Sequence, residues 1–200
     1  GTFQWQTGNT LFMQSGAAFT NNALHDIQAT TTLAQNGGAL STYLNSSTGT
    51  LRVATGTTAT IGTIAFTNNG GTLQANGTLS FDGGNATFIN TSFTGSGINL
   101  VSSNAIFLGT INSTNLLLQS GNYTGAGVGA TLLGTANFTG GLFTGSWEVG
   151  VGSVLSGNAG GNKFLDGATT TFTNNGTFQW QTGNTLFMQS GAAFTNNALH

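Results

Sequence analysis

Few side chains in this sequence are able to do acid–base or metal chemistry. The chain holds four acidic residues, two basic residues and two histidines. They are Asp26, Asp82, Glu148, Asp166, Arg52, Lys163, His25 and His200. Cleavage of a polysaccharide needs carboxylates that lie together as acid, base or cation ligands. The question for the fold is therefore whether it brings any of these groups together.

The best-placed acidic pair is Glu148 and Asp166, which lie 18 residues apart with Lys163 between them. Two interpretations stay open: a surface charge cluster of little energetic value, or a site for a cation or a sugar. His25 stands beside Asp26, and we interpret this histidine as a polar surface residue.

Asp82 and Asp166 are each followed by glycine, as in calcium-binding turns. One carboxylate falls far short of the six or more oxygens that calcium takes, and the turn preference of Asp-Gly explains both places better. We therefore predict no catalytic residue, no metal site and no cofactor, and we expect that the chain is not an enzyme.

Composition narrows the class of protein. Charged residues make up 3% of the chain, against roughly 25% in an ordinary globular protein. The net charge of −2 gives no basic surface for nucleic acid, and no apolar run reaches the roughly 20 residues of a membrane helix. Hydrophobic residues still reach 38%, with 15 Phe and three Trp, which favours a packed core over disorder. Cys is absent, so disulfides and thiolate sites are excluded.

The sequence repeats itself at long range. Residues 176–200 are identical to residues 1–25 at every position, with an offset of 175. Identity that extends over every position indicates a tandem duplication and not convergence. We interpret 1–175 as one full tandem repeat and 176–200 as the start of the next identical repeat. We expect the chain to be a window on a longer array.

A shorter rhythm runs inside the repeat, because an aromatic residue stands two positions before an asparagine again and again. The pairs are Phe19 with Asn21, Tyr43 with Asn45, Phe66 with Asn68, Phe88 with Asn90, Phe172 with Asn174, and Phe194 with Asn196. Weaker markers that lack the aromatic residue are Asn112, Asn137 and Asn158. Successive markers are about 22 residues apart, which gives about eight coils per 175-residue repeat.

Each step of this rhythm has room for three short strands. The segments are rich in Thr, Phe, Leu and Ile and are broken by Gly and Asn, a composition typical of strands and turns. Short strands at a fixed period predict an all-β fold, a right-handed parallel β-solenoid. Asn-Gly pairs such as Asn36-Gly37 and Asn76-Gly77 are hairpin signals, and an antiparallel sandwich or propeller is the alternative.

A solenoid gives the marker residues a structural role. Coils stack about 4.8 Å apart, so like residues lie above like. We predict an inward aromatic column and a ladder of asparagine amides at a corner, where asparagine tolerates the left-handed conformation. Trp147, in the segment GSWEVGVG, is the aromatic residue that we expect to be exposed for surface contact.

The phrases FTNNGGTLQANGTL and FTNNGTFQW resemble the repeats of large bacterial surface β-helix proteins. These are autotransporter passengers and filamentous-haemagglutinin-type adhesins. The resemblance implies export, a location that is extracellular or at the cell surface, and a role in adhesion or in building a fibre or sheath.

Three functions follow from these observations. The first is a structural, non-catalytic repeat of a giant extracellular fibre, stalk or sheath. The alternative is a surface adhesin module that binds a glycan or a solid surface. A remote alternative is ice binding, which needs a regular outward grid of threonines such as Thr30–Thr32. Expected partners are further copies of the repeat, neighbouring solenoids and, for the adhesin, a surface glycan; we expect no nucleic acid and no membrane insertion.

Overall fold

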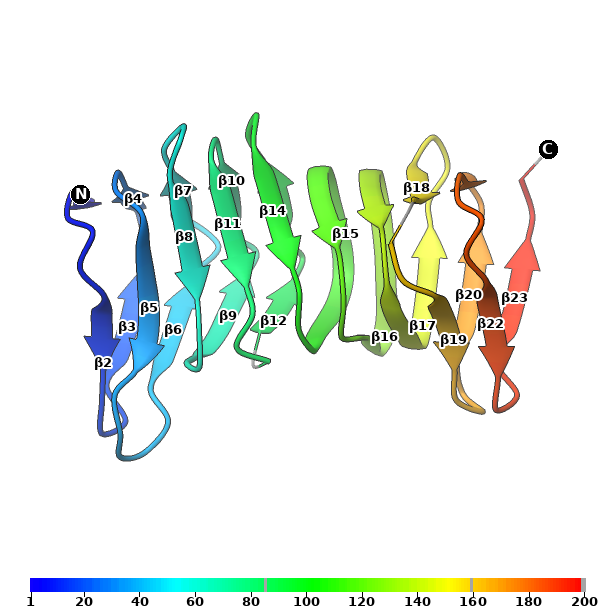
Figure 1. The fold of residues 1–200 in the computed structure, drawn as a ribbon, viewed down its shortest axis with the longest axis horizontal. Helices are drawn as coiled ribbons and strands as arrows, with labels where there is room; N and C mark the ends of the chain where they lie inside the picture. Colours follow the sequence, from blue (N-terminus) through cyan, green and yellow to red (C-terminus); the bar gives the residue numbers. More distant parts are fainter. Residues whose placement is uncertain (85, 159, 199–200) are drawn as a thin grey trace.

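The chain winds into a stack of parallel coils. The computed structural model describes residues 1–84, 86–158 and 160–198. The strands form about nine turns of about 21 residues each, and the two termini lie at opposite ends of the stack (Figure 1). Every strand pairing of the described residues is parallel, between one coil and the next. The predicted parallel β-solenoid is therefore confirmed, and the antiparallel alternative is wrong.

Each turn places one strand segment on each of three faces. The separate strands of face 1 are β1 (Thr2–Trp5), β4 (Leu24–Ile27), β7 (Thr50–Val53), β10 (Thr72–Ala75), β13 (Ser92–Thr94), β20 (Thr171–Asn174) and β23 (Ala193–Asn196). Those of face 2 are β2 (Leu11–Met13), β5 (Thr31–Gln35), β8 (Thr58–Ile61), β11 (Thr78–Phe81), β14 (Ile98–Val101), β18 (Val154–Gly157) and β21 (Thr177–Trp180). Those of face 3 are β3 (Ala18–Asn21), β6 (Thr42–Asn45), β9 (Ala65–Asn69), β12 (Ala86–Ile89), β19 (Lys163–Asp166) and β22 (Leu186–Gln189).

Three longer strands bend from one face to the next. Strands β15 (Ala105–Leu118) and β16 (Asn122–Phe138) each run along faces 3, 1 and 2 in turn. Strand β17 (Gly141–Val149) runs along faces 3 and 1. The first bend of β15 lies at Gly109, which has a φ of 72°, a conformation that glycine adopts without steric cost.

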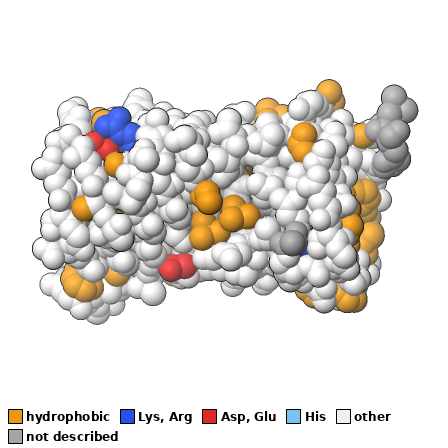
Figure 2. All heavy atoms as spheres, turned by 45° about the horizontal axis from the view of Figure 1, so that its top comes forward, with side chains coloured by type: hydrophobic (Ala, Val, Ile, Leu, Met, Phe, Trp, Pro, Cys, Tyr) orange, Lys and Arg blue, Asp and Glu red, His pale blue; other side chains and the backbone are white. Residues whose placement is uncertain are grey.

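The core fills the space between the three faces. Alternate residues of each strand point inward, as in β10, where Leu73 and Ala75 are fully buried and Thr72 and Gln74 are not. Outward positions are mostly Thr, Ser, Asn and Gln, and charged side chains are few and scattered on the face that Figure 2 shows. Like charges stacked at the spacing of neighbouring strands would repel each other. This spacing explains why the chain is so poor in charge. No helix long and apolar enough to cross a membrane is found in the described part of the chain.

The close approach of neighbouring coils predicts a sharp difference between two glycines. A Cβ atom added to Gly97 would collide with the carbonyl oxygen of Gly77, whereas one added to Gly161 would meet nothing within 4 Å. We expect Gly97→Ala to lower the free energy of unfolding by roughly 1–3 kcal/mol and Gly161→Ala to change it little. Urea denaturation of both variants checks this, and equal midpoints would contradict the stacking at Gly97.

Candidate functional site

A ladder of asparagine amides runs along the corner between face 3 and face 1. Asn21 Nδ2 donates to Asn45 Oδ1 at 2.7 Å, and Asn45 Nδ2 donates to Asn68 Oδ1 at 2.6 Å. Asn45 Nδ2 also lies 3.2 Å from the carbonyl oxygens of Gly49 and Thr72. Asn45 and Asn68 are fully buried, and neither has the expected positive φ. The amides therefore tie three consecutive coils together from inside the stack.

The ladder ends where the predicted series would continue to Asn90. Phe88, and not Asn90, pairs in register with Asn68, because the coil from Phe66 to its partner Ala86 is 20 residues long, shorter than the marker spacing. Asn90 is exposed with a φ of 45°. The predicted place of Asn90 in the ladder is therefore wrong.

Other groups take over the contacts of the missing amide. Asn68 Nδ2 donates to Thr91 Oγ1 at 2.8 Å, and Asn90 Oδ1 accepts a hydrogen bond from the backbone of Thr110 at 3.0 Å. Asn90 is thus a corner residue with a left-handed backbone. This is the backbone conformation that we predicted for every asparagine of the ladder.

A second amide pair lies near the end of the chain. Asn174 Nδ2 donates to Asn196 Oδ1 at 2.7 Å. The rings of Phe172 and Phe194 stack beside them, with centroids 5.4 Å apart and planes within 6°. These four residues belong to β20 and β23 on face 1, whereas the first ladder ends the strands of face 3.

The aromatic markers pack inside the coils. The centroids of Phe19 and Tyr43 are 4.9 Å apart, and those of Tyr43 and Phe66 are 5.3 Å apart, both stacked. Phe88 lies 6.3 Å from Phe66 with the rings tilted by 54°, because its register is shifted. Phe88 instead pairs with Phe107, at 5.0 Å. The column therefore continues as a packed aromatic core and not as one unbroken stack.

Trp147 is buried, and the prediction that it is exposed is wrong. Its side chain is 4% exposed, and Nε1 donates to the carbonyl oxygens of Tyr123 and Thr144. Strand β17 turns at Gly145, which has a φ of 71°, and after this bend alternate residues from Trp147 onward point inward. The outward Glu148 that follows was the sequence signal for this orientation.

The outward aromatic pair lies elsewhere and was not predicted. The rings of Phe164 and Phe187 stack with centroids 5.1 Å apart and planes within 12°. They lie on the outer side of face 3, and Phe187 is 39% exposed. Phe187 is the copy of Phe12, which is 58% exposed. The position of Phe12 between Leu11 and Met13, whose side chains point inward, was the feature of the sequence from which its outward orientation could have been predicted.

One ion pair joins two coils of face 1. Arg52 Nε lies 2.8 Å from Asp26 Oδ1, and Arg52 Nη2 lies 2.8 Å from Asp26 Oδ2. The hydrogen bonds from Arg52 hold the pKa of Asp26 below its usual range. The two residues are register partners in β4 and β7. Their separation by about one coil length was the feature of the sequence from which this ion pair could have been predicted.

The predicted cluster of Glu148, Lys163 and Asp166 does not form. Glu148 lies on face 1 and accepts a hydrogen bond from Asn175 at 2.7 Å, while Asp166 lies on face 3 opposite Gln189. In the described residues, no three side chains of His, Cys, Asp or Glu are placed to hold a metal ion.

Lys163 is fully buried, so its assignment to a surface cluster is wrong. Its Nζ donates to the carbonyl oxygen of Gly161 at 3.1 Å and lies 5.3 Å from the centre of the Trp180 ring. Burial lowers the pKa of Lys163. In β19 this residue alternates inward with Leu165, which leaves the intervening Phe164 outside.

His25 is also inside the stack, so its interpretation as a surface residue is wrong. Its ring lies 4.8 Å from Phe3 and 5.4 Å from Phe19, and Nδ1 is 2.7 Å from the hydroxyl of Tyr43. Burial lowers the pKa of His25 from 6.5 to about 4, although the charge of Asp26 acts in the opposite direction. His200, the copy of His25, lies outside the described residues.

The buried histidine predicts that acid weakens the fold. The unfolded chain binds a proton on His25 at a higher pH than the folded chain. The contribution of His25 to stability therefore rises between about pH 4 and 6.5 and is constant above that window. We expect a loss of roughly 3 kcal/mol on acidification through this window. Denaturation curves measured across it provide the test, with His25→Leu as the matched variant. An unchanged slope in that variant would assign the effect to other groups.

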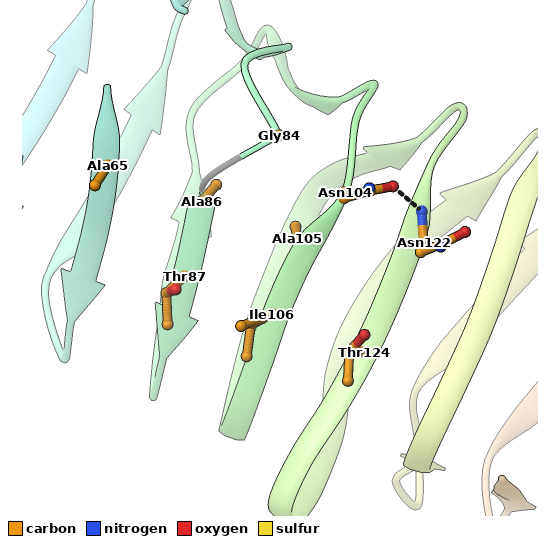
Figure 3. A pocket seen from close by; sticks show the side chains of 9 residues that line it. All are labelled: Ala65, Gly84, Ala86, Thr87, Asn104, Ala105, Ile106, Asn122 and Thr124. Carbon is orange, nitrogen blue, oxygen red and sulfur yellow. Dashed lines mark hydrogen bonds between the residues drawn. The ribbon is translucent and has the colours of Figure 1, made fainter. Parts of the chain in front are cut away.

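A shallow depression of about 410 Å³ crosses face 3. Its lining residues are Ala65, Gly84, Ala86, Thr87, Asn104, Ala105, Ile106, Asn122 and Thr124 (Figure 3). Across its floor the outward row of register partners reads Thr87, Ile106 and Thr124. The isoleucine interrupts the row of threonines, and the lining residues carry no charge.

No protein-family model, no curated protein and no solved structure matches the chain. The assignment of function therefore depends on the fold and on the placement of the residues described above.

Proposed function

We propose that this chain is a structural, non-catalytic segment of a giant extracellular fibre, stalk or sheath. The observation that carries the proposal is the junction between the two copies of the repeat. Strands β21, β22 and β23 of the second copy pair in register with β18, β19 and β20 of the first. A second repeat therefore extends the stack without a linker or a break.

The contacts inside the stack support a structural role. Each coil is joined to the next by ladder hydrogen bonds on three faces, and amides and aromatic rings add contacts along the same direction. In such a stack each coil contacts only its neighbours, so further coils lengthen the stack without changing the packing of the existing core. The proposed location outside the cell is supported by the resemblance to bacterial surface β-helix repeats.

Electron microscopy of the source cells, labelled with an antibody to the repeat, tests this function. We expect labelled threads or a sheath with an axial period near 40 Å, the height of one repeat at about 4.8 Å per coil. Label confined to short projections, or dispersed in the medium without axial order, would contradict the proposal.

A second candidate function is adhesion, which the outward stack of Phe164 and Phe187 favours. Flat aromatic surfaces of this kind stack on the apolar faces of sugar rings. Binding of the purified chain to a panel of immobilised glycans tests this, with Phe164→Ala as the variant. Binding that persists in Phe164→Ala would remove the aromatic pair from consideration.

A further inference from the structure

The two copies of the repeated sequence do not lie on the same faces of the solenoid. The first three strands, β1, β2 and β3, lie on faces 1, 2 and 3. Their identical copies are β21, β22 and β23, and these lie on faces 2, 3 and 1. Each copy is therefore moved on by one face, although its strands keep their boundaries to within one residue.

The register pairs of face 3 demonstrate the shift. Starting at Phe19, each inward residue leads to its partner in the next coil. The series is Phe19, Tyr43, Phe66, Ala86, Ala105, Tyr123, Phe143, Leu165 and Met188. It ends at Met188, which is the copy of Met13, and not at Phe194, which is the copy of Phe19.

The asparagine ladders show the same displacement. Asn21 ends a strand of face 3, while its copy Asn196 ends a strand of face 1. Strands β15 and β16 each supply three face segments and β17 supplies two, so the 175 residues from β1 to β21 cover 25 segments of seven residues on average. The repeat thus spans eight turns and one third, and not a whole number of turns.

We call this displacement by one face the phase of the repeat. From it we propose that tandem copies of the repeat build a solenoid with a threefold screw relation, in which each copy is turned by one third of a turn from the one before. The inference rests on the proposed function in one respect, which is that further copies follow in the fibre. The turn comes in addition to any gradual twist of the stacked strands. Three copies restore the original face after roughly 120 Å of axis, at about 4.8 Å per coil.

In such an array, the second copy continues on the end formed by β21, β22 and β23. It is lined by Phe178, Trp180, Leu186, Met188 and Phe194 together with Asn174 and Asn196. In the first copy, the identical strands β1, β2 and β3 are covered by β4, β5 and β6. The partner of this end is therefore a chain segment with the sequence of residues 24–45, docked one face further round.

The rotation distributes each surface feature around the fibre. The outward pair of Phe164 and Phe187 lies on face 3 at this junction, and it would lie on faces 1 and 2 at the following two junctions. A neighbouring fibre would then find the same contact on three sides. A lateral contact through this pair would then be available in three directions and not only along one edge.

Cysteine cross-linking within the 200-residue chain tests the phase directly, because the chain has no Cys of its own. Ser156 and Gln179 are outward register partners on face 2, and neighbouring strands lie within the separation that a disulfide spans. We expect S156C/Q179C to form an intramolecular disulfide on mild oxidation. The matched control is E148C/Q179C, since a whole-turn repeat would move Gln179 to face 1, the face on which Glu148 lies. Cross-linking of the control pair alone would overturn the inference.

An array of six copies tests the screw relation over length. Val151 is 84% exposed, so Val151→Cys offers one gold-labelling site per copy. In electron micrographs we expect successive labels roughly 40 Å apart along the axis, each one third of a turn further round, so that every third label lies on the same side. Labels along a single line would overturn the inference. Val128→Cys, at a site that is 90% exposed, is the second variant. Both tests use purified protein, so a failure of the proposed cellular role would appear only in the labelled cells.

Discussion

Replacing Asn45 with leucine will lower the free energy of unfolding by roughly 4 kcal/mol, because each buried polar group left without a partner costs about 1–3 kcal/mol. The change removes the donor to Asn68 Oδ1, one of the two acceptors of Asn21 Nδ2, and the side-chain donor to the carbonyl oxygens of Gly49 and Thr72. All four contacts lie at a corner where neighbouring coils meet. Asn45 is fully buried, so water does not replace them.

Urea denaturation followed by circular dichroism measures this effect. The matched control is Asn69→Leu, since Asn69 is exposed on β9 next to the buried Asn68. Amide hydrogen exchange adds a spatial readout, because each coil contacts only its neighbours. Loss of protection should be greatest in the coils of Asn21 and Asn68. A uniform loss along the stack, or equal destabilisation by both variants, would show that the amide ladder has no special role.

The second large effect is expected from Phe88→Ala, with a loss of roughly 3–5 kcal/mol. Phe88 is fully buried, and its ring lies 5.0 Å from Phe81, 5.1 Å from Phe93 and 5.0 Å from Phe107. These rings come from all three faces, so the cavity opens at the centre of the stack. Phe12→Ala is the control, because that ring is 58% exposed. A midpoint of Phe88→Ala close to that of the control would contradict the packing.

The period of the fold was predictable from the sequence, because stacking places like residues above like. The aromatic and asparagine markers of the first three coils recur at the length of one coil, and their side chains meet in the structure. The composition also followed from the stack, since parallel strands at close spacing exclude rows of like charge.

The phase of the repeat was not predictable from the same markers. Asn112 lies on face 1, whereas Asn137 lies on face 2 and Asn158 directly follows the face 2 strand β18. The side chains of Asn137 and Asn158 form an exposed hydrogen bond of 2.7 Å. The markers thus pass from face to face while their average spacing stays close to one coil. Counting them gives about eight coils and conceals the additional third of a turn.

The orientation of single side chains could not be predicted from the sequence beyond the bends. Alternation in a strand predicts which side chains point inward only until the strand turns a corner, where the pattern restarts. Trp147 follows the bend of β17 at Gly145, and Lys163 opens β19 after a turn. His25 was assigned outward because of its polarity, whereas its place in β4 between outward Leu24 and Asp26 set the opposite direction.

The continuous junction between the copies also bears on how the gene for such a tandem repeat changes over generations. Because the second copy continues the stack on the first with the same in-register pairing, the gain or loss of a whole copy by recombination creates no new interface. Every such product has the same packing at each junction, and it differs in length and in the face on which its last copy lies. If the proposed fibre is correct, selection acts on its length in steps of one copy, without any change to the folding of the chain.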